Sequence, residues 1–430
     1  MPPFTPILIL GSIELLLHHG TLGIARSAGK LGVPVFSGHP GRRTRGCLSR
    51  YCRAQVRLPA DVSGEETLAC LRAFADRHGP SVLVPIDDAS AIFIADHADA
   101  LAGASFLFPR QHTGLVRTLA SKREMYELCR EHGIPTPLSL FPSDAEEVLA
   151  SAGKMRFPVV AKRIDGSQST RTQSRADAAA VAGRQPPSVL IAGDRDELLA
   201  AYEAMESPLQ PNVMLQEYVP GGRDWMFNGY FDANCECRVG FTGRKYRQSP
   251  PYTGATTLGV CASNATVEQH TVRLAKAVGY RGAVDVDCRY DVRDGQYKLL
   301  DFNPRIGSTF RLFVGGNGVD VLRAMYLDLT GQPVPAVEAP EGRRWLTAPL
   351  DVRSVLIYLR NGDITLSEWA RSLRDVQETA WFSWDDPRPA AAMLTMLLVD
   401  RARRVMRRGH AAPVGANAWA VGAAGHQSPA

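Results

Sequence analysis

The first part of the chain alternates between short aliphatic runs and longer stretches with helical spacing. Residues 7–10 are all aliphatic and predict a buried strand, and a loop that contains glycines separates them from a helix ending near Leu31. Residues 33–36 and 82–85 predict two further strands. Strands that alternate with helices are typical of a parallel sheet, so residues 1–110 are expected to form a Rossmann-like domain.

Further along, the pattern predicts a smaller lobe in which single helices and strands are interleaved. Residues 121–133 predict a helix and residues 157–163 a strand. A helix over 196–205 and a strand over 213–218 follow. We expect this lobe to span residues 111–212.

Alternating apolar and polar positions then predict a β-rich lobe over residues 225–302, interrupted by one helix near 267–278. We place this larger lobe within residues 213–335. After a Pro-rich linker, residues 336–408 predict a helical extension, and the composition of residues 409–430 is typical of a disordered tail. The expected fold class is therefore α/β, with several lobes.

Residues 282–305, GAVDVDCRYDVRDGQYKLLDFNPR, predict a β-hairpin. Arg293-Asp294-Gly295 has the composition of a three-residue loop, with glycine where a positive φ is needed. Such a loop pairs Val292 with Gln296, and this register can be counted outward along both strands.

Counting outward sets Asp287 directly opposite Asp301, and Asn303 lies two residues further along on the same face. Two carboxylates held this close repel each other unless a cation lies between them, and oxygen donors suit Mg²⁺. Arg305 follows at once, with a guanidinium suited to phosphate or carboxylate. The alternative is a solvated sheet face that carries acidic residues without a metal.

The pattern of an acid on one strand and acid-x-Asn-x-Arg on the next resembles the metal-binding signature of ATP-grasp enzymes. The resemblance implies an ATP-grasp fold behind a Rossmann-like domain, with ATP and Mg²⁺ (or Mn²⁺) bound. It also implies that Asp287 and Asp301 bridge two Mg²⁺ ions, that Asn303 ligates one, and that Arg305 meets the transferred phosphoryl group or an acyl phosphate.

Other segments resemble the nucleotide cleft of that superfamily, in the expected order. Lys122 opens a helix where the superfamily places a cation that contacts phosphate. Residues 158–162 resemble the strand whose lysine, here Lys162, grips the α- and β-phosphates. The loop that follows would be a phosphate lid, with the backbone N–H groups of Gly166 and Ser167 as donors.

Residues 215–222 resemble the adenine hinge of ATP-grasp enzymes. In that position the carbonyl of Glu217 and the N–H of Val219 would read the adenine edge, with Tyr218 between them. Asp224 would fall where an acid binds the ribose hydroxyls.

Residues 228–232 and 241–251 are similar to the branch that includes D-aspartate ligases and related carboxylate–amine ligases. By that similarity Arg244, Lys245 and Arg247 would join the arginine of the hairpin in a cationic wall that faces the γ-phosphate and the attacking carboxylate.

Arg311 and Asn317 follow the hairpin and are candidates for binding the carboxylate of an amino acid. A buried ion pair is an equally good interpretation of Arg311.

The resemblance implies an enzyme that phosphorylates a carboxylate to an acyl phosphate and condenses it with an amine, releasing ADP and phosphate. Its partners would be small-molecule acids and amines. A carboxyphosphate- or carbamoyl-phosphate-forming enzyme and a catalytically silent nucleotide-binding regulator stay open as alternatives. A dinucleotide oxidoreductase is disfavoured because the first domain lacks GxGxxG.

Composition and charge limit the kinds of partner and the cellular location expected for this chain. The formal net charge of +5 is small for 430 residues, and the scattered basic residues predict no nucleic-acid face. Of 49 basic residues only seven are lysine, and three of these lie at expected ligand positions. No apolar run approaches the roughly 20 residues of a membrane span. The eight cysteines form no CxxC pairs, as expected of thiols in a reducing cytoplasm. A homodimer is possible.

Overall fold

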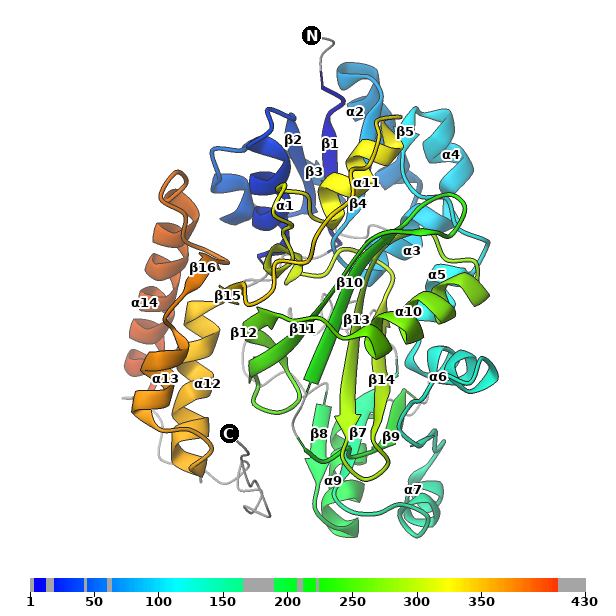
Figure 1. Cartoon of the computed structure of the whole chain (residues 1–430), viewed down its shortest axis with the longest axis vertical. Coiled ribbons are helices and arrows are strands. Elements are labelled where there is room, and N and C mark those ends of the chain that lie inside the picture. The colour runs from blue at the N-terminus through cyan, green and yellow to red at the C-terminus, as the bar shows by residue number, and fades with distance from the viewer. Residues whose placement is uncertain are drawn as a thin grey trace.

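The computed structural model describes residues 4–12, 19–41, 45–59, 64–164, 189–206, 212–221 and 224–408. Its strands form three sheets. The N-terminal sheet lies at one end of the long axis, the large sheet in the middle and the small sheet at the other end, although the small sheet precedes the large one in the chain (Figure 1). The predicted lid residues Gly166 and Ser167 and the predicted tail over 409–430 lie outside the described residues. The lobe boundaries stay a prediction.

The N-terminal sheet has five parallel strands in the order β3-β2-β1-β4-β5, which confirms the parallel arrangement expected there. Its central strand is buried along its whole length, which explains the continuous aliphatic run. The strands are β1 (Ile7–Leu10), β2 (Val35–Pro40), β3 (Cys52–Leu58), β4 (Ser81–Pro85) and β5 (Phe106–Leu107). The helices are α1 (Gly20–Gly29), α2 (Glu65–His78), α3 (Asp88–Asp96) and α4 (Ala98–Gly103).

The small sheet has four antiparallel strands in the order β6-β9-β7-β8, and α7 and α9 pack together beside it. Its strands are β6 (Ser139–Leu140), β7 (Val159–Arg163), β8 (Val189–Ala192) and β9 (Val213–Glu217). The helices in this part of the chain are α5 (Leu115–Ala120), α6 (Lys122–Glu131), α7 (Ala145–Ala152) and α9 (Arg195–Met205).

The large sheet has seven strands in the order β14-β13-β10-β11-β12-β15-β16. Five come from the predicted β-rich lobe: β10 (Asp224–Phe231), β11 (Cys237–Ser249), β12 (Ala255–Cys261), β13 (Gly282–Asp291) and β14 (Gln296–Asn303). The other two, β15 (Arg344–Leu346) and β16 (Val376–Thr379), come from residues 336–408, for which only helices were predicted. That prediction was incomplete because these strands are short and exist by pairing in space, β15 with β12 and β16 with β15.

The remaining α-helices lie between the strands of the large sheet along the chain and in residues 336–408, which we call the C-terminal extension. They are α10 (Ala265–Ala277), α11 (Val321–Leu329), α12 (Ala348–Asn361), α13 (Leu366–Ser372) and α14 (Arg388–Arg408), with 3₁₀ turns η1 (Arg45–Leu48) and η3 (Phe310–Leu312). Within the described residues, no helix combines the length and apolar character needed to cross a membrane.

The β13–β14 hairpin reaches its predicted register by a different route. Its first pair is Asp291 with Gln296, one residue earlier than predicted, and Gly295 has the positive φ of +72°. The register then shifts between Asp287 and Cys288, where Leu300 is the extra residue of a bulge. The bulge compensates for the longer loop, and Asp287 is opposite Asp301 as expected from the sequence.

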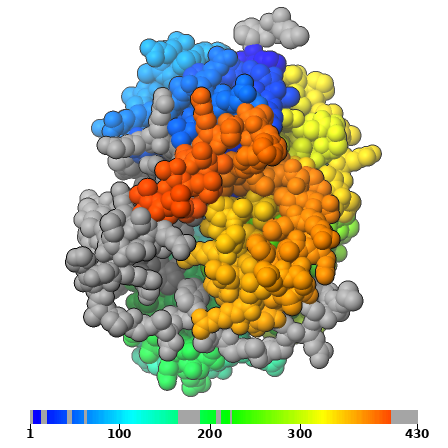
Figure 2. Space-filling view, turned by 90° about the vertical axis from the view of Figure 1, so that its left-hand side faces the viewer, coloured from blue at the N-terminus to red at the C-terminus, as the bar shows by residue number. Residues whose placement is uncertain are grey.

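The C-terminal extension returns to the N-terminal domain (Figure 2). The buried Arg26 of α1 donates from Nε to Oδ2 of Asp386 at 3.0 Å and from Nη2 to the carbonyl of Trp381 at 2.9 Å. Asp386 also accepts from the hydroxyl of Ser49 at 2.7 Å. Asp386 therefore holds the C-terminal extension against the N-terminal domain.

Candidate functional site

Two carboxylates face each other on the β13–β14 hairpin. Asp287 is the register partner of Asp301, and Asp285 is the partner of Asn303. This confirms the shared face predicted from the sequence. Neighbouring strands of an antiparallel pair hold opposite side chains close together, so the carboxylates form a concentrated negative patch.

Lysines from three elements surround this patch. Lys245 of β11 places Nζ 2.7 Å from Oδ2 of Asp287. Lys122, at the start of α6, and Lys162 of β7 each place Nζ 3.8 Å from a carboxylate oxygen of Asp301. The small sheet and the large sheet therefore meet at Asp301, and the site lies between them.

Local structure fixes the two lysines of the small lobe. Ser121 caps α6 through the N–H of Glu124, and the backbone N–H of Lys122 donates to the carbonyl of Ile164 at 3.2 Å. Because Ile164 directly follows β7, this bond ties the start of α6 to the strand that carries Lys162. The ammonium groups of Lys122 and Lys162 are thereby both directed toward the carboxylate of Asp301.

Burial and neighbouring charge act against each other in this cluster. Burial lowers the pKa of Lys162, and the nearby Asp301 only partly offsets this effect. Burial would raise the pKa of Asp301, but Lys162 and Lys122 outweigh it and the pKa is lowered. For Lys245, burial acts to lower the pKa, but the combined effect of Asp287, Asp224 and Asp285 outweighs it and the pKa is raised. Lys162 and Lys245 are thus charged groups held in largely buried positions beside carboxylates that are about a quarter exposed, at 29% for Asp301 and 27% for Asp287.

Asp285 is a third carboxylate on this face, and it was not among the predicted site residues. It accepts a hydrogen bond from Nδ2 of Asn228 at 2.8 Å. Burial and the charge of Asp287 raise its pKa to about 6. The signal was present in the sequence, because the alternation Asp285-Val286-Asp287 places both acids on one face.

Arg305 connects the hairpin to the N-terminal domain. Its Nε donates to Oδ1 of Asp88, the first residue of α3, at 2.9 Å, and its Nη2 donates to Oδ1 of Asn303 at 3.2 Å. The guanidinium therefore lies beside the carboxylate face, as the predicted role requires.

The predicted hinge, residues 215–222, begins within β9 and lies against the hairpin. The carboxylate of Glu217 is 2.7 Å from Nη1 of Arg293 in the hairpin loop, and Val219 is buried. The guanidinium of Arg289 lies 5.9 Å from the ring centroid of Tyr218. Adenine recognition by the backbone of this segment stays a proposal.

Asp224, predicted to bind the ribose hydroxyls, lies in a buried ion pair with Arg289. Its buried carboxylate accepts from Nη2 of Arg289 at 2.9 Å and also from the side-chain amide of Gln248. A carboxylate that neutralises a buried guanidinium is costly to divert to a ligand. The contacts present make Asp224 a structural partner of Arg289, and ribose binding by its carboxylate stays a prediction.

Two members of the predicted cationic wall also lie elsewhere. Arg244 stacks between the rings of Trp225 and Tyr246, at 5.8 and 5.7 Å from their centroids, and as the neighbour of Lys245 on the strand it points to the other face. The buried Arg247 forms a two-pronged pair with Asp351 of α12, at 2.8 and 2.9 Å. A β-bulge explains why Arg247 lies on a different face of the sheet from the one predicted.

That bulge interrupts β11 between Lys245 and Arg247. In a regular strand these two residues would share a face, but the extra residue Tyr246 reverses the alternation. Of Arg244, Lys245 and Arg247, only Lys245 therefore reaches the carboxylates of the hairpin.

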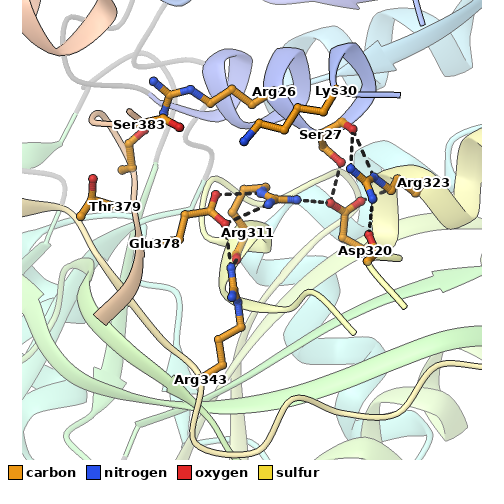
Figure 3. A network of polar contacts seen from close by, with 12 residues as sticks. Arg26, Ser27, Lys30, Arg311, Asp320, Arg323, Arg343, Glu378, Thr379 and Ser383 are labelled. Carbon is orange, nitrogen blue, oxygen red and sulfur yellow. Dashed lines mark hydrogen bonds and ion pairs between the residues drawn. The ribbon is translucent and has the colours of Figure 1, made fainter. Parts of the chain in front are cut away.

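Arg311 lies in a polar network (Figure 3). Its Nη1 is 2.6 Å from Oδ2 of Asp320, and its Nε and Nη2 donate to Glu378 of β16 at 2.9 and 2.8 Å. Glu378 also accepts from Arg343 at 2.7 Å. The buried ion-pair interpretation is thus the one the structure supports.

Asn317, the second residue predicted to bind the carboxylate of an amino acid, lies in the exposed loop that follows the 3₁₀ turn η3. Its Nδ2 donates to the carbonyl of Ala336 at 2.9 Å, and its Oδ1 accepts from the N–H of Val319. These bonds hold the loop in place.

The donor set of the carboxylate face fits a magnesium ion completed by ligand oxygens. Among the side chains that the structure describes, no three His, Cys, Asp or Glu residues form a self-contained metal site. Asp287, Asp301 and the amide of Asn303 instead offer hard oxygen donors on one face. These three residues would hold Mg²⁺ together with phosphate oxygens and water.

Comparisons with known proteins agree with this arrangement. No protein-family model matches the chain. Over 312 residues, 69% of this chain and 70% of the relative, the sequence is 25% identical to a D-aspartate ligase of Enterococcus faecium (strain Aus0004).

Solved structures share the fold at low sequence identity. An L-amino acid ligase from Bacillus licheniformis has a TM-score of 0.58 and 15% identity, covering 80% of this chain and 79% of the other. An N5-carboxyaminoimidazole ribonucleotide synthetase bound to ADP has a TM-score of 0.61 and 12% identity, covering 84% and 86%. The biotin carboxylase domain dimer of the Hydrogenobacter thermophilus 2-oxoglutarate carboxylase, solved with MgADP and bicarbonate, has a TM-score of 0.56 and 16% identity, covering 78% and 73%.

Proposed function

We propose that this chain, whose fold is that of the ATP-grasp enzymes, is an ADP-forming carboxylate–amine ligase that acts on amino-acid-like substrates. The observation that carries the proposal is the meeting at Asp301 of two lysines from the small lobe with the carboxylate face of the large lobe. The distant relationship to a D-aspartate ligase favours this reaction over others on the same fold.

In the proposed reaction a carboxylate oxygen attacks the γ-phosphorus of ATP, and the bond to the β-phosphate oxygen breaks to release ADP. The amine nitrogen then attacks the acyl carbon, loses its proton, and displaces phosphate. The first step brings a carboxylate toward a polyanion, so positive charge must be concentrated at the site.

The chain supplies that charge from both sides. Lys122 and Lys162 would hold the phosphates, and Arg305 would meet the transferred phosphoryl group. Lys245, buried beside Asp287, would face the attacking carboxylate. Mg²⁺, when bound by Asp287, Asp301 and Asn303, would supply further charge neutralisation of the phosphate oxygens.

The decisive experiment uses an ¹⁸O-labelled carboxylate. The protein is incubated with ATP, Mg²⁺ and pools of labelled amino acids, and ADP and phosphate are measured separately. Transfer of ¹⁸O into phosphate, together with hydroxamate formation when hydroxylamine replaces the amine, is the expected result. AMP and pyrophosphate as products would exclude this mechanism.

The same experiment separates the alternatives. ADP release that depends on bicarbonate and not on an amino acid would identify a carboxyphosphate-forming enzyme. Nucleotide binding without turnover in any pool would identify a regulator. A homodimer, by analogy with the dimeric carboxylase domain, stays a prediction for sedimentation analysis.

A further inference from the structure

A polar contact between segments 217 residues apart joins the N-terminal domain to the candidate site. Nε of Arg305, which follows the hairpin, donates to Oδ1 of Asp88 at 2.9 Å. Both side chains are largely removed from solvent, with 18% and 27% exposed. This ion pair lies in a setting where water competes weakly for either partner.

Asp88 is itself held by a rigid scaffold. It is the first residue of α3, and the preceding Asp87 caps this helix by accepting from the N–H of Ser90 at 2.8 Å. The other carboxylate oxygen of Asp87 accepts from the N–H of Ser12, two residues after the end of β1, at 2.7 Å. The start of α3 is therefore fixed to the central strand of the parallel sheet, and the position of Asp88 is set by that sheet.

The remaining contacts of Arg305 leave part of its guanidinium available. Nη2 donates to Oδ1 of Asn303 at 3.2 Å, and Nη1 makes a long contact of 3.4 Å with the carbonyl of Ile306. Each Nη carries two hydrogens, so both keep an N–H group for a ligand. Because Asp88 engages Nε, rotation about the end of the side chain is restricted, and the two Nη atoms present one edge.

We propose that Asp88 is a positioning residue for the ligase reaction. It orients Arg305 so that the Nη edge of the guanidinium faces the phosphoryl group that is transferred from ATP. The inference rests on the proposed function for its kinetic consequence. Without Asp88, the guanidinium would turn toward the neighbouring carboxylate of Asp285 or toward solvent. Misplacing a group that stabilises the transition state lowers the rate of the chemical step more than it weakens substrate binding.

The test compares Asp88→Asn and Asp88→Glu with a matched control, Asp96→Asn. Asp96 ends the same helix and forms an ion pair with Arg117 at 2.8 Å, in an exposed position at the other end of α3. Asp88→Asn should lower kcat about 10- to 100-fold and leave the KM for ATP within about twofold of the native value. Asp88→Glu should recover part of the loss, and Asp96→Asn should behave as the native protein.

A purely structural role for Asp88 makes a different prediction. It would lower the thermal unfolding midpoint and leave kcat unchanged, and that result would overturn the proposal. A double-mutant cycle adds a second criterion. In an Arg305→Ala background, Asp88→Asn should have little further effect on residual ADP release, whereas full additivity would show that the two residues act independently.

Nuclear magnetic resonance separates failure of this inference from failure of the proposed function. The Nε–H signal of Arg305, identified by its absence from Arg305→Lys, should exchange slowly with water in the native protein and in Asp96→Asn. It should exchange at least about tenfold faster in Asp88→Asn. An unchanged signal there would refute the positioning role even if no substrate pool supports turnover, and inactivity of the native protein would count against the ligase alone.

Discussion

Lys162 of β7 and Asp301 of β14 lie on different sheets, yet their charged groups are 3.8 Å apart. Lys162 is largely buried, and burial lowers its pKa. A lysine and an aspartate brought together in this way, without closer hydrogen bonding, leave both charges open to a ligand. In the proposed function, a nucleotide would bind between the two lobes at the position of this pair.

Asp301→Asn should therefore abolish ADP release, by at least about 10³-fold, because the hairpin loses a hard anionic oxygen donor. The fold should persist, as judged by circular dichroism and the unfolding midpoint. Asp294→Asn, in the loop of the same hairpin and paired with Lys298, is the matched control and should retain activity. Normal turnover in Asp301→Asn would mean that the carboxylate face has another role.

The pair formed by Arg247 and Asp351 is expected to support stability. Asp351 is buried and also accepts from the hydroxyl of Thr257 and the indole N–H of Trp369. Asp351→Ala strands a buried guanidinium and should cost about 3–5 kcal/mol, measured by urea unfolding. Glu236→Gln, which removes the exposed pair with Lys276, should cost no more than about 1 kcal/mol. Similar losses in the two variants would contradict the assignment of Arg247 to the interior.

Two basic residues of α1 offer a test of how the C-terminal extension is attached. Arg26 is buried against Asp386, whereas Lys30, one turn later, forms a half-exposed pair with Asp385 at 3.2 Å. Arg26→Gln should accelerate hydrogen exchange in residues 380–386 and lower the unfolding midpoint, because it removes the donor of buried carbonyls and the cationic partner of the Asp386 carboxylate. Lys30→Gln should change neither by much. Equal effects would show that the extension is held elsewhere.

His39, at the end of β2, predicts a specific dependence of stability on pH. Burial lowers its pKa to about 4, below the ordinary value of 6.5. Between these values the unfolded chain binds a proton that the folded chain does not, so stability falls as the pH drops from about 6.5 to 4. Replacing the residue by His39→Gln should remove about 1.4 kcal/mol per pH unit of this slope.

The measurement for His39 is urea unfolding of both proteins from pH 5 to 8. The difference between native and variant free energies should change across the acidic part of the range and level off above about pH 7, where the imidazole is neutral in both states. A difference that stays constant throughout would mean that His39 is not neutral when folded.

Local periodicity was enough to predict much of this protein. The aliphatic run of β1 is typical of a strand buried on both faces, which indicates a parallel sheet. The alternation in β13 and β14 belongs to a local hairpin, so the shared face of Asp287 and Asp301 could be derived directly. Lys122 and Lys162 were found by resemblance, and the structure brings both to Asp301.

Partner choice over long separations was decided only by the tertiary structure. The sequence alone does not show whether a basic residue will pair with an anionic ligand or with an acidic residue from a distant part of the chain. Arg247 is held by Asp351 and Arg311 by Glu378, while Asp88 comes from the first domain to meet Arg305. A single extra residue, Tyr246, turned one side chain to the opposite face. The sequence by itself thus determined which faces carry charge, and packing of distant segments decided which of those charges stay free for chemistry.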